Sequence, residues 1–467
     1  MGTIKIEGIE IYPAQTEGSP DVYSESPFRL AKAKWVSDDE ASICIACNQR
    51  FTQLRRKHHC RMCGRVLCSK CCKEKVPLPQ LSLHDPERVC DICLPVTELV
   101  TKARSGSTAF QIEASTGLLE NVCDPKGLRK VVELGGLQTL IYLSRVNAQP
   151  VKRACASGIH TMSTHQPLQH LLADAGAIKA ICSILSTADE SQETLIIDAI
   201  SALMIFVKSP HLKTKAISDG ALQPVLKLCG MQASEAIALL AVRTLNLITE
   251  HAGNHAAIIE NDRNALPHLL SLTTSSDEQM QEITLKTLGG LSMGTDWHRH
   301  RIVQEDFSSG RCLARVLRSR PKNKQVLCNA ACLVANLATG EQDQGSLSEC
   351  VDSLCTLLSE FRSQKELLKH VARALANFAK YRHNAFRLVE RLPVIITICL
   401  KSNAEDVAQQ GMRIVLHLLQ HSPDSTINCL LTDGATDLLK FISKSPGMVD
   451  AMQSTLLMRA AEREAPS

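Results

Sequence analysis

The sequence predicts two modules, a small cysteine-rich α+β finger followed by an all-α superhelical solenoid. Two observations predict them: eight cysteines stand in four Cys-x2-Cys pairs between residues 44 and 93, and an apolar helical unit recurs every 40–46 residues from about residue 108 onward. The chain has 467 residues, 44% of them hydrophobic, which is ordinary for globular domains. We therefore expect a flexible leader over residues 1–33, the finger over 34–95, a linker over 96–107 and about eight repeats over 108–467.

The leader is expected to lack a fold of its own, because its second half is polar and contains Pro13, Gly18 and Pro20. Isoleucines at positions 4, 6, 9 and 11 predict at most a short hairpin that turns at Glu7-Gly8. The linker begins in a helical pattern and ends in a Gly/Ser break. The sequence therefore leaves the orientation of the two modules open.

The four cysteine pairs predict two tetrahedral zinc sites, because four thiolates complete the coordination of one zinc ion. Gaps of twelve, four and eighteen residues separate the pairs. Alternate pairs are expected to share an ion in a cross-brace: Cys44, Cys47, Cys68 and Cys71 at one site, and Cys60, Cys63, Cys90 and Cys93 at the other. Each ion can add about 10–16 kcal/mol of folding free energy. A disulfide framework is the alternative, and Cys72 is a spare thiol that could compete with Cys71.

Three further motifs surround these cysteines. Trp35-Val36-Ser37-Asp38 precedes the first pair, a basic run from Arg56 to Arg61 surrounds the second, and Arg88-Val89-Cys90 leads into the fourth. Together with the cysteines they resemble the FYVE zinc finger, a family that binds phosphatidylinositol 3-phosphate on endosomal membranes. The resemblance covers residues 34–95 and implies these headgroup contacts: Trp35, Asp38, Arg56, Lys57, His58, His59, Arg61 and Arg88.

The chemistry of those side chains suits the ligand. Arginine forks and histidine N–H donors match a phosphomonoester that carries nearly two negative charges. Asp38 can accept hydrogen bonds from inositol hydroxyls and can repel a further phosphate. In the family the loop before the basic run inserts into the bilayer, and here Leu54 is its apolar wedge. Full burial of one leucine is worth about 1.5–3 kcal/mol, so we expect weak membrane retention.

Positive charge is concentrated in the finger. Residues 34–95 hold eleven Lys/Arg against seven Asp/Glu, an excess equal to the +4 of the whole chain. Such a footprint favours an anionic surface. We expect no nucleic-acid partner, because aromatic residues make up 3% of the chain. No catalytic motif stands out and no run of eighteen apolar residues exists, while the scattered cysteines favour a reducing compartment. These features predict a cytoplasmic protein that is not an enzyme and has no transmembrane segment.

The repeats are marked by a small or polar residue before an apolar helical run. Successive marks stand at Gly136, Gly176, Gly220, Asn264, Gly310, Cys350, Leu392 and Gly434. Two long amphipathic stretches and a short helix per unit, with a bend at the glycine, resemble armadillo repeats. HEAT repeats, which have two helices per unit, are the alternative.

In armadillo proteins an asparagine on one helix of each repeat often bonds the main chain of an extended partner peptide. The resemblance implies a partner groove at four positions: Asn121, Asn246, Asn336 and Asn377. An amide suits this role because it both donates and accepts. Ile205 and Gly290 interrupt the series. In the alternative, the same amides satisfy neighbouring helix ends or water.

These features together predict an adaptor or scaffold in membrane trafficking. The finger would recognise phosphatidylinositol 3-phosphate on early endosomes, where the protein is peripheral, and the repeats would bind an unidentified protein partner. A RING-like ubiquitin ligase is one alternative, because RING domains also interleave two zinc ions. A zinc-stabilised protein or nucleic-acid binder without lipid specificity is another.

Overall fold

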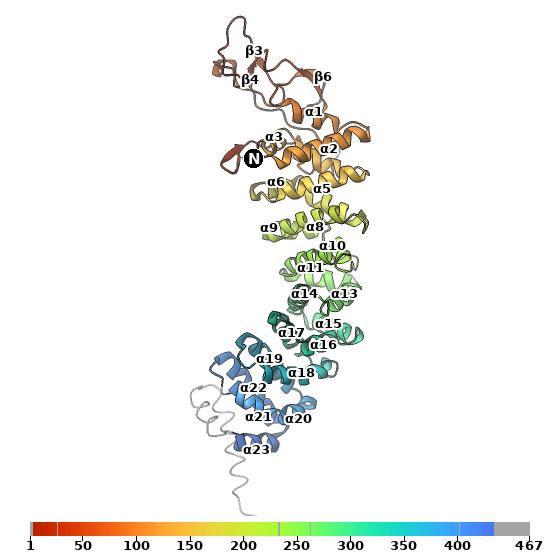
Figure 1. Ribbon diagram of the computed structural model, residues 1–467, viewed down its shortest axis with the longest axis vertical. Helices are drawn as coiled ribbons and strands as arrows, with labels where there is room; N and C mark the ends of the chain where they lie inside the picture. Colours follow the sequence, from red (N-terminus) through yellow and green to blue (C-terminus); the bar gives the residue numbers. More distant parts are fainter. Residues whose placement is uncertain (1–2, 26, 232–233, 262, 401, 434–467) are drawn as a thin grey trace, which may run out of the picture. The chain divides into compact units, whose positions relative to one another are not determined.

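The computed structural model describes residues 3–25, 27–231, 234–261, 263–400 and 402–433 (Figure 1). The chain divides into two compact units, Met1–Leu247 and Ile248–Ser467. The first unit holds the leader, the finger and the first helical repeats, and the second unit holds further repeats.

The finger is built from two short antiparallel hairpins and one helix. Strand β3 (Lys57–His59) pairs with β4 (Val66–Cys68), and β5 (Lys75–Leu78) pairs with β6 (Leu83–Arg88). One-turn helices η1 (Asp38–Glu40) and η2 (Pro79–Leu81) and helix α1 (Leu94–Lys102) complete the module. The predicted small α+β finger is thus confirmed.

The helical part is built of repeats with three helices each, which favours armadillo over HEAT repeats. The helices of the first compact unit that follow α1 are α2 (Thr108–Cys123), α3 (Pro125–Glu133), α4 (Gly136–Leu143), α5 (Gln149–Ser163), α6 (Gln166–Asp174), α7 (Ala177–Thr187), α8 (Glu193–Lys208), α9 (Pro210–Ser218) and α10 (Leu222–Cys229). Helix α11 (Glu235–Thr249) begins in this unit and contains its last residue, Leu247. The second unit continues with η3 (Ala252–Asn254), α12 (His255–Asn261), α13 (Ala265–Leu272), α14 (Glu278–Leu291), α15 (Asp296–Ser308), α16 (Cys312–Arg318), α17 (Lys324–Leu337), η4 (Glu341–Asp343), α18 (Ser348–Glu360), α19 (Lys365–Ala379), α20 (Arg382–Glu390), α21 (Leu392–Ile395), η5 (Ile396–Leu400), α22 (Glu405–His421) and α23 (Pro423–Asp433).

Glycines make the bends inside the repeats. Gly135, Gly176, Gly220 and Gly310 have left-handed φ angles between 84° and 92°, which a Cβ would oppose. Gly135, rather than the neighbouring Gly136, makes the first bend. The last predicted mark, Gly434, lies outside the described residues. Long helices then pack on one another in order: α2, α5 and α8 in the first unit, and α14, α17, α19 and α22 in the second.

The leader begins with the predicted hairpin. Strand β1 (Ile4–Ile6) pairs with β2 (Ile9–Ile11), and the turn places Glu7 and Gly8 at φ angles of 49° and 81°. The pairing confirms the predicted turn. Strand β2 packs against α3 and β1 against α6, which buries the Ile6 and Ile11 side chains.

Residues 12–25 and 27–31, which we call the strap, then run along the first repeats to the finger. The Ala14 N–H donates to the Val132 carbonyl at 3.0 Å, the Val22 N–H to the Ala175 carbonyl at 3.1 Å, and the Leu30 N–H to the Gln80 carbonyl at 2.8 Å. Val22, Phe28 and Leu30 are buried. The leader therefore differs from the flexible segment expected, because isolated apolar side chains and main-chain hydrogen bonds hold it against other parts of the chain.

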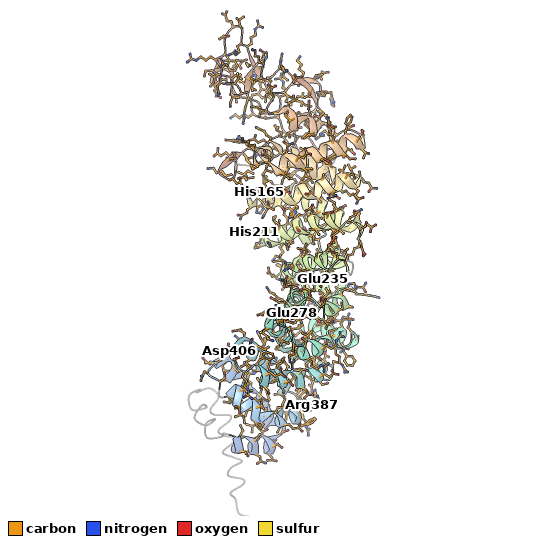
Figure 2. The ribbon with its side chains drawn as sticks, viewed as in Figure 1. His165, His211, Glu235, Glu278, Arg387 and Asp406 are labelled. Carbon is orange, nitrogen blue, oxygen red and sulfur yellow. The ribbon has the colours of Figure 1, made fainter. Side chains whose placement is uncertain are left out.

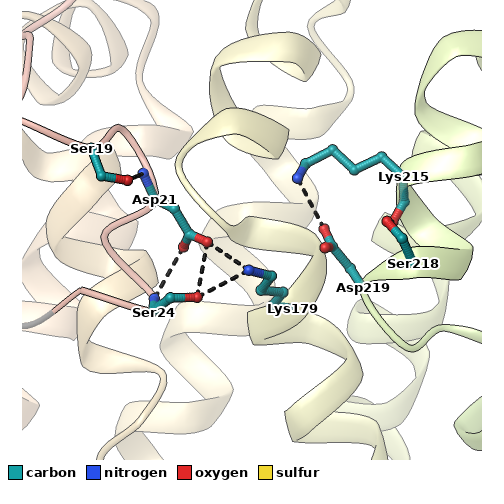
Figure 3. A network of polar contacts seen from close by, with 7 residues as sticks. All are labelled: Ser19, Asp21, Ser24, Lys179, Lys215, Ser218 and Asp219. Carbon is teal, nitrogen blue, oxygen red and sulfur yellow. Dashed lines mark hydrogen bonds and ion pairs between the residues drawn. The ribbon is translucent and has the colours of Figure 1, made fainter.

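A polar network fixes the middle of the strap (Figure 3). The Lys179 ammonium, on α7, donates to the Asp21 carboxylate at 2.7 Å and to the Ser24 hydroxyl at 3.0 Å. Burial raises the pKa of Asp21, but the hydrogen bonds from Lys179 and Ser24 outweigh it and lower that pKa below its ordinary value. The ion pair thus joins the leader to the second bend, where a Cβ on Gly176 would stand 2.4 Å from the Asp21 carboxylate.

The predicted linker also joins the modules. Helix α1 packs against β5 of the finger and against α2 and α4 of the repeats. Just beyond α1, the Arg104 guanidinium donates to the Phe28 carbonyl at 2.8 Å and lies 4.5 Å from the centre of the Phe28 ring. Within the first unit, the finger and the first repeats are thus packed together through α1 and the strap.

Candidate functional site

The paired cysteines form two clusters, in each of which the four sulfur atoms lie within 4.8 Å of one another. One cluster holds Cys44, Cys47, Cys68 and Cys71, and the other holds Cys60, Cys63, Cys90 and Cys93. The Sγ atoms of Cys47 and Cys68 are 3.8 Å apart, about the edge of a tetrahedron built from ~2.3 Å zinc–sulfur bonds. The donor sets fit two zinc ions, and the predicted cross-brace is confirmed.

Backbone N–H groups donate hydrogen bonds to one sulfur atom in each cluster. The Cys68 N–H donates to Cys44 Sγ at 3.4 Å, and the Cys90 N–H donates to Cys60 Sγ at 3.3 Å. Burial raises the pKa of Cys44, but hydrogen bonds led by that from Cys68 lower it to about 6. Zinc binds the thiolate form, so these hydrogen bonds favour the ligand state.

Cys72 lies outside both clusters. It is fully buried, and burial raises the pKa of its thiol to about 12. The neighbouring Cys71 provides the sulfur atom in the first cluster. We therefore assign Cys72 to packing rather than to zinc coordination.

The Trp35–Asp38 motif lies beside β3 because Gly64 lets the backbone approach closely. A Cβ on Gly64 would stand 2.3 Å from the Lys34 carbonyl oxygen, and the Val36 N–H donates to the Gly64 carbonyl at 3.0 Å. The Trp35 ring stacks on the His59 ring with their centres 4.3 Å apart. Stacking holds the motif to the basic strand.

Lys57 and His59 contact the same motif, as alternate residues of a strand should. Lys57 Nζ donates to the Asp38 carbonyl at 2.5 Å, and His59 Nε2 hydrogen-bonds the Val36 carbonyl at 2.9 Å. The Asp38 carboxylate lies 3.9 Å from His59 Nε2, and 59% of the Asp38 side chain remains exposed. Asp38 therefore keeps acceptor capacity toward a ligand hydroxyl.

Arg56, His58 and Arg88 form a second group. Burial lowers the pKa of His58, and the positive charges of Arg88 and Arg56 lower it further. The Arg61 N–H donates to the Arg88 carbonyl at 2.9 Å, which joins the basic run to the end of β6. The Arg88 guanidinium donates to the Cys72 carbonyl at 2.8 Å. The zinc-bound frame thus concentrates positive charge contributed by two separate motifs.

Arg61 is held from two sides. Its guanidinium carbon lies 4.8 Å from the centre of the Trp35 ring, and its Nε donates to the Glu87 carboxylate at 2.9 Å. Glu87 is not among the contacts that the sequence motifs predict. Its only signal in the sequence is its place immediately before Arg88 in a strand, where neighbouring side chains point to opposite faces.

Leu54 stands at the tip of the loop before β3. Its side chain is 97% exposed. The turn beneath it is closed by the Thr52 N–H, which donates to the Arg55 carbonyl at 3.2 Å, and by the Arg55 N–H, which donates to the Thr52 hydroxyl at 3.1 Å. The loop therefore presents one large apolar side chain to solvent, as the sequence predicts.

The predicted groove asparagines make hydrogen bonds inside the repeats. The Asn121 amide donates to the Gly117 carbonyl at 2.8 Å, that of Asn336 to the Ser292 hydroxyl at 2.9 Å, and that of Asn377 to the Ala335 carbonyl at 2.8 Å. Asn246 on α11 is 8% exposed. A partner peptide would have to compete with these hydrogen bonds. In this structure the asparagine amides bond nearby helices, as the alternative to a peptide groove predicts.

Among the described residues, no single helix is long and apolar enough to cross a membrane. Helices α6 and α7 pass the same test as a pair, by length and composition, but they are bent by 77° at their junction.

Fold and site together define a protein with a two-zinc finger followed by armadillo-like helical repeats. Residues 34–98 match the family model of the FYVE zinc finger, so this module is a FYVE zinc finger. The match ends three residues beyond the predicted boundary, inside α1.

Relatives match over short stretches of the chain. A Lateral signaling target protein 2 homolog from Brugia malayi is 45% identical over 64 residues, which are 14% of this chain and 10% of that protein. Vacuolar protein sorting-associated protein 27 from Kluyveromyces lactis is 35% identical over 102 residues, or 22% of this chain and 16% of that protein. The chain thus spans less than a fifth of these relatives' lengths.

Solved structures resemble the helical part. A crystal structure of an engineered protein from the Northeast Structural Genomics Consortium aligns with a TM-score of 0.52 at 20% identity, covering 78% of this chain and 98% of that one. This likeness concerns the fold alone. A computationally designed armadillo repeat protein for modular peptide recognition aligns over 51% of this chain and 98% of its own, with 20% identity and a TM-score of 0.43.

Proposed function

We propose that this protein is a non-enzymatic adaptor whose finger binds phosphatidylinositol 3-phosphate on early endosomal membranes and whose repeats bind a protein partner in membrane trafficking. The observation that carries the lipid half is that the finger joins the basic run to Arg88 of β6, where the Arg61 N–H donates to the Arg88 carbonyl at 2.9 Å. Guanidinium and imidazole donors suit a phosphomonoester, and the exposed Asp38 carboxylate suits inositol hydroxyls.

Different residues of the predicted contact set have different tasks. Arg56 and Arg88 supply charge to the phosphate, and His58 supplies a neutral N–H donor. Trp35 and His59 hold the first motif in place by stacking. Arg61 is already oriented by Trp35 and Glu87, so little side-chain entropy is lost when it meets the ligand.

The decisive measurement is vesicle flotation with the full chain and an Arg61→Ala, Arg88→Ala double variant. We expect the double variant to lose binding to vesicles with phosphatidylinositol 3-phosphate by about a hundredfold or more, since two charge-assisted contacts worth about 1.5–3 kcal/mol each disappear. A Lys70→Ala, Lys73→Ala variant removes the same charge from exposed lysines outside the predicted contact set and should bind almost normally. Zinc content of each variant shows whether its finger remains folded.

If both double variants lose vesicle binding equally, the finger is attracted to the membrane by its overall charge and not by a specific headgroup site. Indifference of the unmodified chain to the 3-phosphate, measured against vesicles of equal charge made with phosphatidylserine, would refute the lipid assignment.

Leu54 offers a separate test of membrane insertion. A Leu54→Ser change should leave the fold intact, because the side chain is 97% exposed. We expect vesicle binding to weaken by about tenfold, part of the about 1.5–3 kcal/mol that full burial of a leucine provides. Binding of the soluble inositol 1,3-bisphosphate headgroup, measured by calorimetry, should stay unchanged. A parallel loss of headgroup binding would place Leu54 in the headgroup site instead of the bilayer.

A further inference from the structure

A pocket of about 240 Å³ opens on the second unit, between the last turns of α18 and the segment from Arg391 to Ile395. That segment holds the turn after α20 and the whole of α21. The described residues that line the pocket therefore lie outside the asparagine-bearing helices α17 and α19. Pockets for drug-sized ligands have about 300–1,000 Å³, so this pocket suits a group of the size of one side chain.

The walls of the pocket are apolar. Four of the lining residues have apolar side chains: Cys355, Leu358, Val394 and Ile395. The two hydroxyls in the lining already donate hydrogen bonds within α18. Thr356 donates to the Asp352 carbonyl at 3.0 Å, and Ser359 donates to the Cys355 carbonyl at 3.2 Å. A group that enters the pocket therefore gains from burying apolar surface.

One wall of the pocket belongs to an irregular helix. Helix α21 has four residues, and the π-helical turn η5 follows it directly. Such turns are rare and are frequent at functional sites. Gly411 of α22 gives this turn room, because a Cβ there would stand 2.8 Å from the Cys399 Cβ. The close packing of η5 on α22 fixes the wall that carries Val394 and Ile395.

Arg391, which lines the pocket, carries an unpaired charge. Its side chain is exposed, and among the residues that the structure describes no carboxylate lies within ion-pair distance of it. Arg387, one turn earlier on α20 and labelled in Figure 2, differs because its guanidinium lies 3.8 Å from the Asp352 carboxylate. The Glu360 carboxylate, the other charged group in the lining, pairs with Arg320 at 2.9 Å.

A second exposed arginine lies beside the pocket. The Arg362 Nε donates to the carbonyl of Ser359, a lining residue, at 3.2 Å. No carboxylate in the described ranges pairs with Arg362. The rim of the pocket thus has two positive charges without a partner, while its one carboxylate is already paired. This balance favours an anionic group at the rim.

We propose that this pocket binds the carboxyl terminus of a partner protein, with the last side chain inside the pocket and the terminal carboxylate on Arg391. The inference rests on the partner half of the proposed function, which it deepens, and does not depend on the lipid half. A terminal residue carries its side chain and its carboxylate on the same carbon atom. This pairing matches apolar walls with an unpaired guanidinium beside them, and arginine binds carboxylates through two parallel hydrogen bonds.

The chemistry favours a chain end over other anions. Inorganic phosphate and inositol phosphates have no apolar part for the walls, and the acyl chains of a membrane lipid are larger than a pocket of about 240 Å³ accommodates. An internal glutamate next to a leucine is the nearest competitor, because it also combines a carboxylate with an apolar side chain. The two carboxylates lie at different distances from the apolar group, so peptides can distinguish them.

The test uses the full chain and fluorescence anisotropy with a labelled six-residue peptide of serine and glycine that ends in leucine with a free carboxylate. Three matched peptides have a carboxamide end, a terminal serine, or an internal leucine-glutamate pair with a carboxamide end. We expect the leucine acid to bind. Each of the other peptides should bind about tenfold or more weakly, because each lacks either the terminal carboxylate or the apolar side chain beside it.

Two variants of the protein test the two parts of the pocket separately. Arg391→Gln removes the carboxylate partner and should weaken binding of the leucine acid by about tenfold or more. Thr356→Phe fills the pocket from an exposed position of α18, which the fold should tolerate, and should weaken binding as much. Arg382→Gln is the matched control, because Arg382 is an exposed arginine at the start of α20 that does not line the pocket.

Unchanged peptide binding in Arg382→Gln, with thermal unfolding unchanged in all three variants, supports the pocket. Absence of binding by the leucine acid, equal binding of its carboxamide, tighter binding of the internal glutamate peptide, or equal weakening by Arg382→Gln overturns the proposal. Vesicle flotation of the same variants reports the lipid half separately. We expect flotation to be unchanged, so a failed peptide test leaves that half of the proposed function standing.

Discussion

Cys60→Ala is expected to unfold the finger and abolish vesicle binding. Cys60 belongs to the second cluster, and its sulfur atom also accepts the Cys90 N–H. Loss of one thiolate opens a tetrahedral site whose ion contributes about 10–16 kcal/mol of apparent binding free energy in small zinc peptides. Elemental analysis should find two zinc ions per unmodified chain and fewer in the variant. Removal of zinc from the unmodified chain with a strong chelator should reproduce the loss of binding.

Cys72→Ala is the matched control for this experiment. It removes a neighbouring buried thiol that lies outside both clusters. We expect this variant to retain both zinc ions and its vesicle binding, with a modest loss of stability from the missing sulfur atom. Loss of zinc from the Cys72 variant, with zinc retained in a Cys71 variant, would reverse the ligand assignment.

Phe28→Ala is expected to detach the strap and to lower the free energy of unfolding of the first unit by about 3–5 kcal/mol, the usual cost of removing a buried phenylalanine ring. Phe28 is 6% exposed. The centre of its ring lies 5.9 Å from the centre of the Tyr142 ring, and the Arg104 guanidinium lies over the same ring. Urea denaturation followed by circular dichroism gives the free energy. Limited proteolysis should show faster cleavage within residues 12–31.

Phe110→Ala serves as the matched control, because the Phe110 ring, on α2, is 48% exposed. The effect of Phe110→Ala on stability should be small. Equal stability of Phe28→Ala and Phe110→Ala would show that the strap contributes little.

Asp21 makes the stability of the strap depend on pH. The folded-state pKa of Asp21 is lowered from an ordinary value of 3.8, so its contribution to the free energy of unfolding is present above that value and is lost as the pH falls through the folded pKa. Asp21→Asn should remove this part of the acid sensitivity.

The zinc frame could be predicted from the sequence because its constraints are local. A Cys-x2-Cys pair has few ways to present two sulfur atoms, and gaps of twelve, four and eighteen residues favour alternate pairing. The repeat class was also accessible, since glycine bends recur with the period. In both cases a short segment carries its own structural signal.

The strap and the partners of the asparagines could not be predicted in this way. Val22, Phe28 and Leu30 follow no helical or strand period, and each meets a surface made by distant residues. The sequence shows the asparagine positions. Their arginine partners lie further along the chain, Arg373 37 residues after Asn336 and Arg413 36 residues after Asn377. Which partner an amide chooses depends on helix packing, which sequence spacing alone does not define.

The strap limits the directions in which the first repeats can point when the finger alone is attached to a membrane. A scaffold on a flexible linker samples all directions, which lowers the effective concentration of anything bound to it. Here the finger and the first repeats share one packed unit, held by the strap and α1. A finger seated on its lipid would therefore set the tilt of those repeats above the bilayer, and a partner held on them would meet the membrane at one angle.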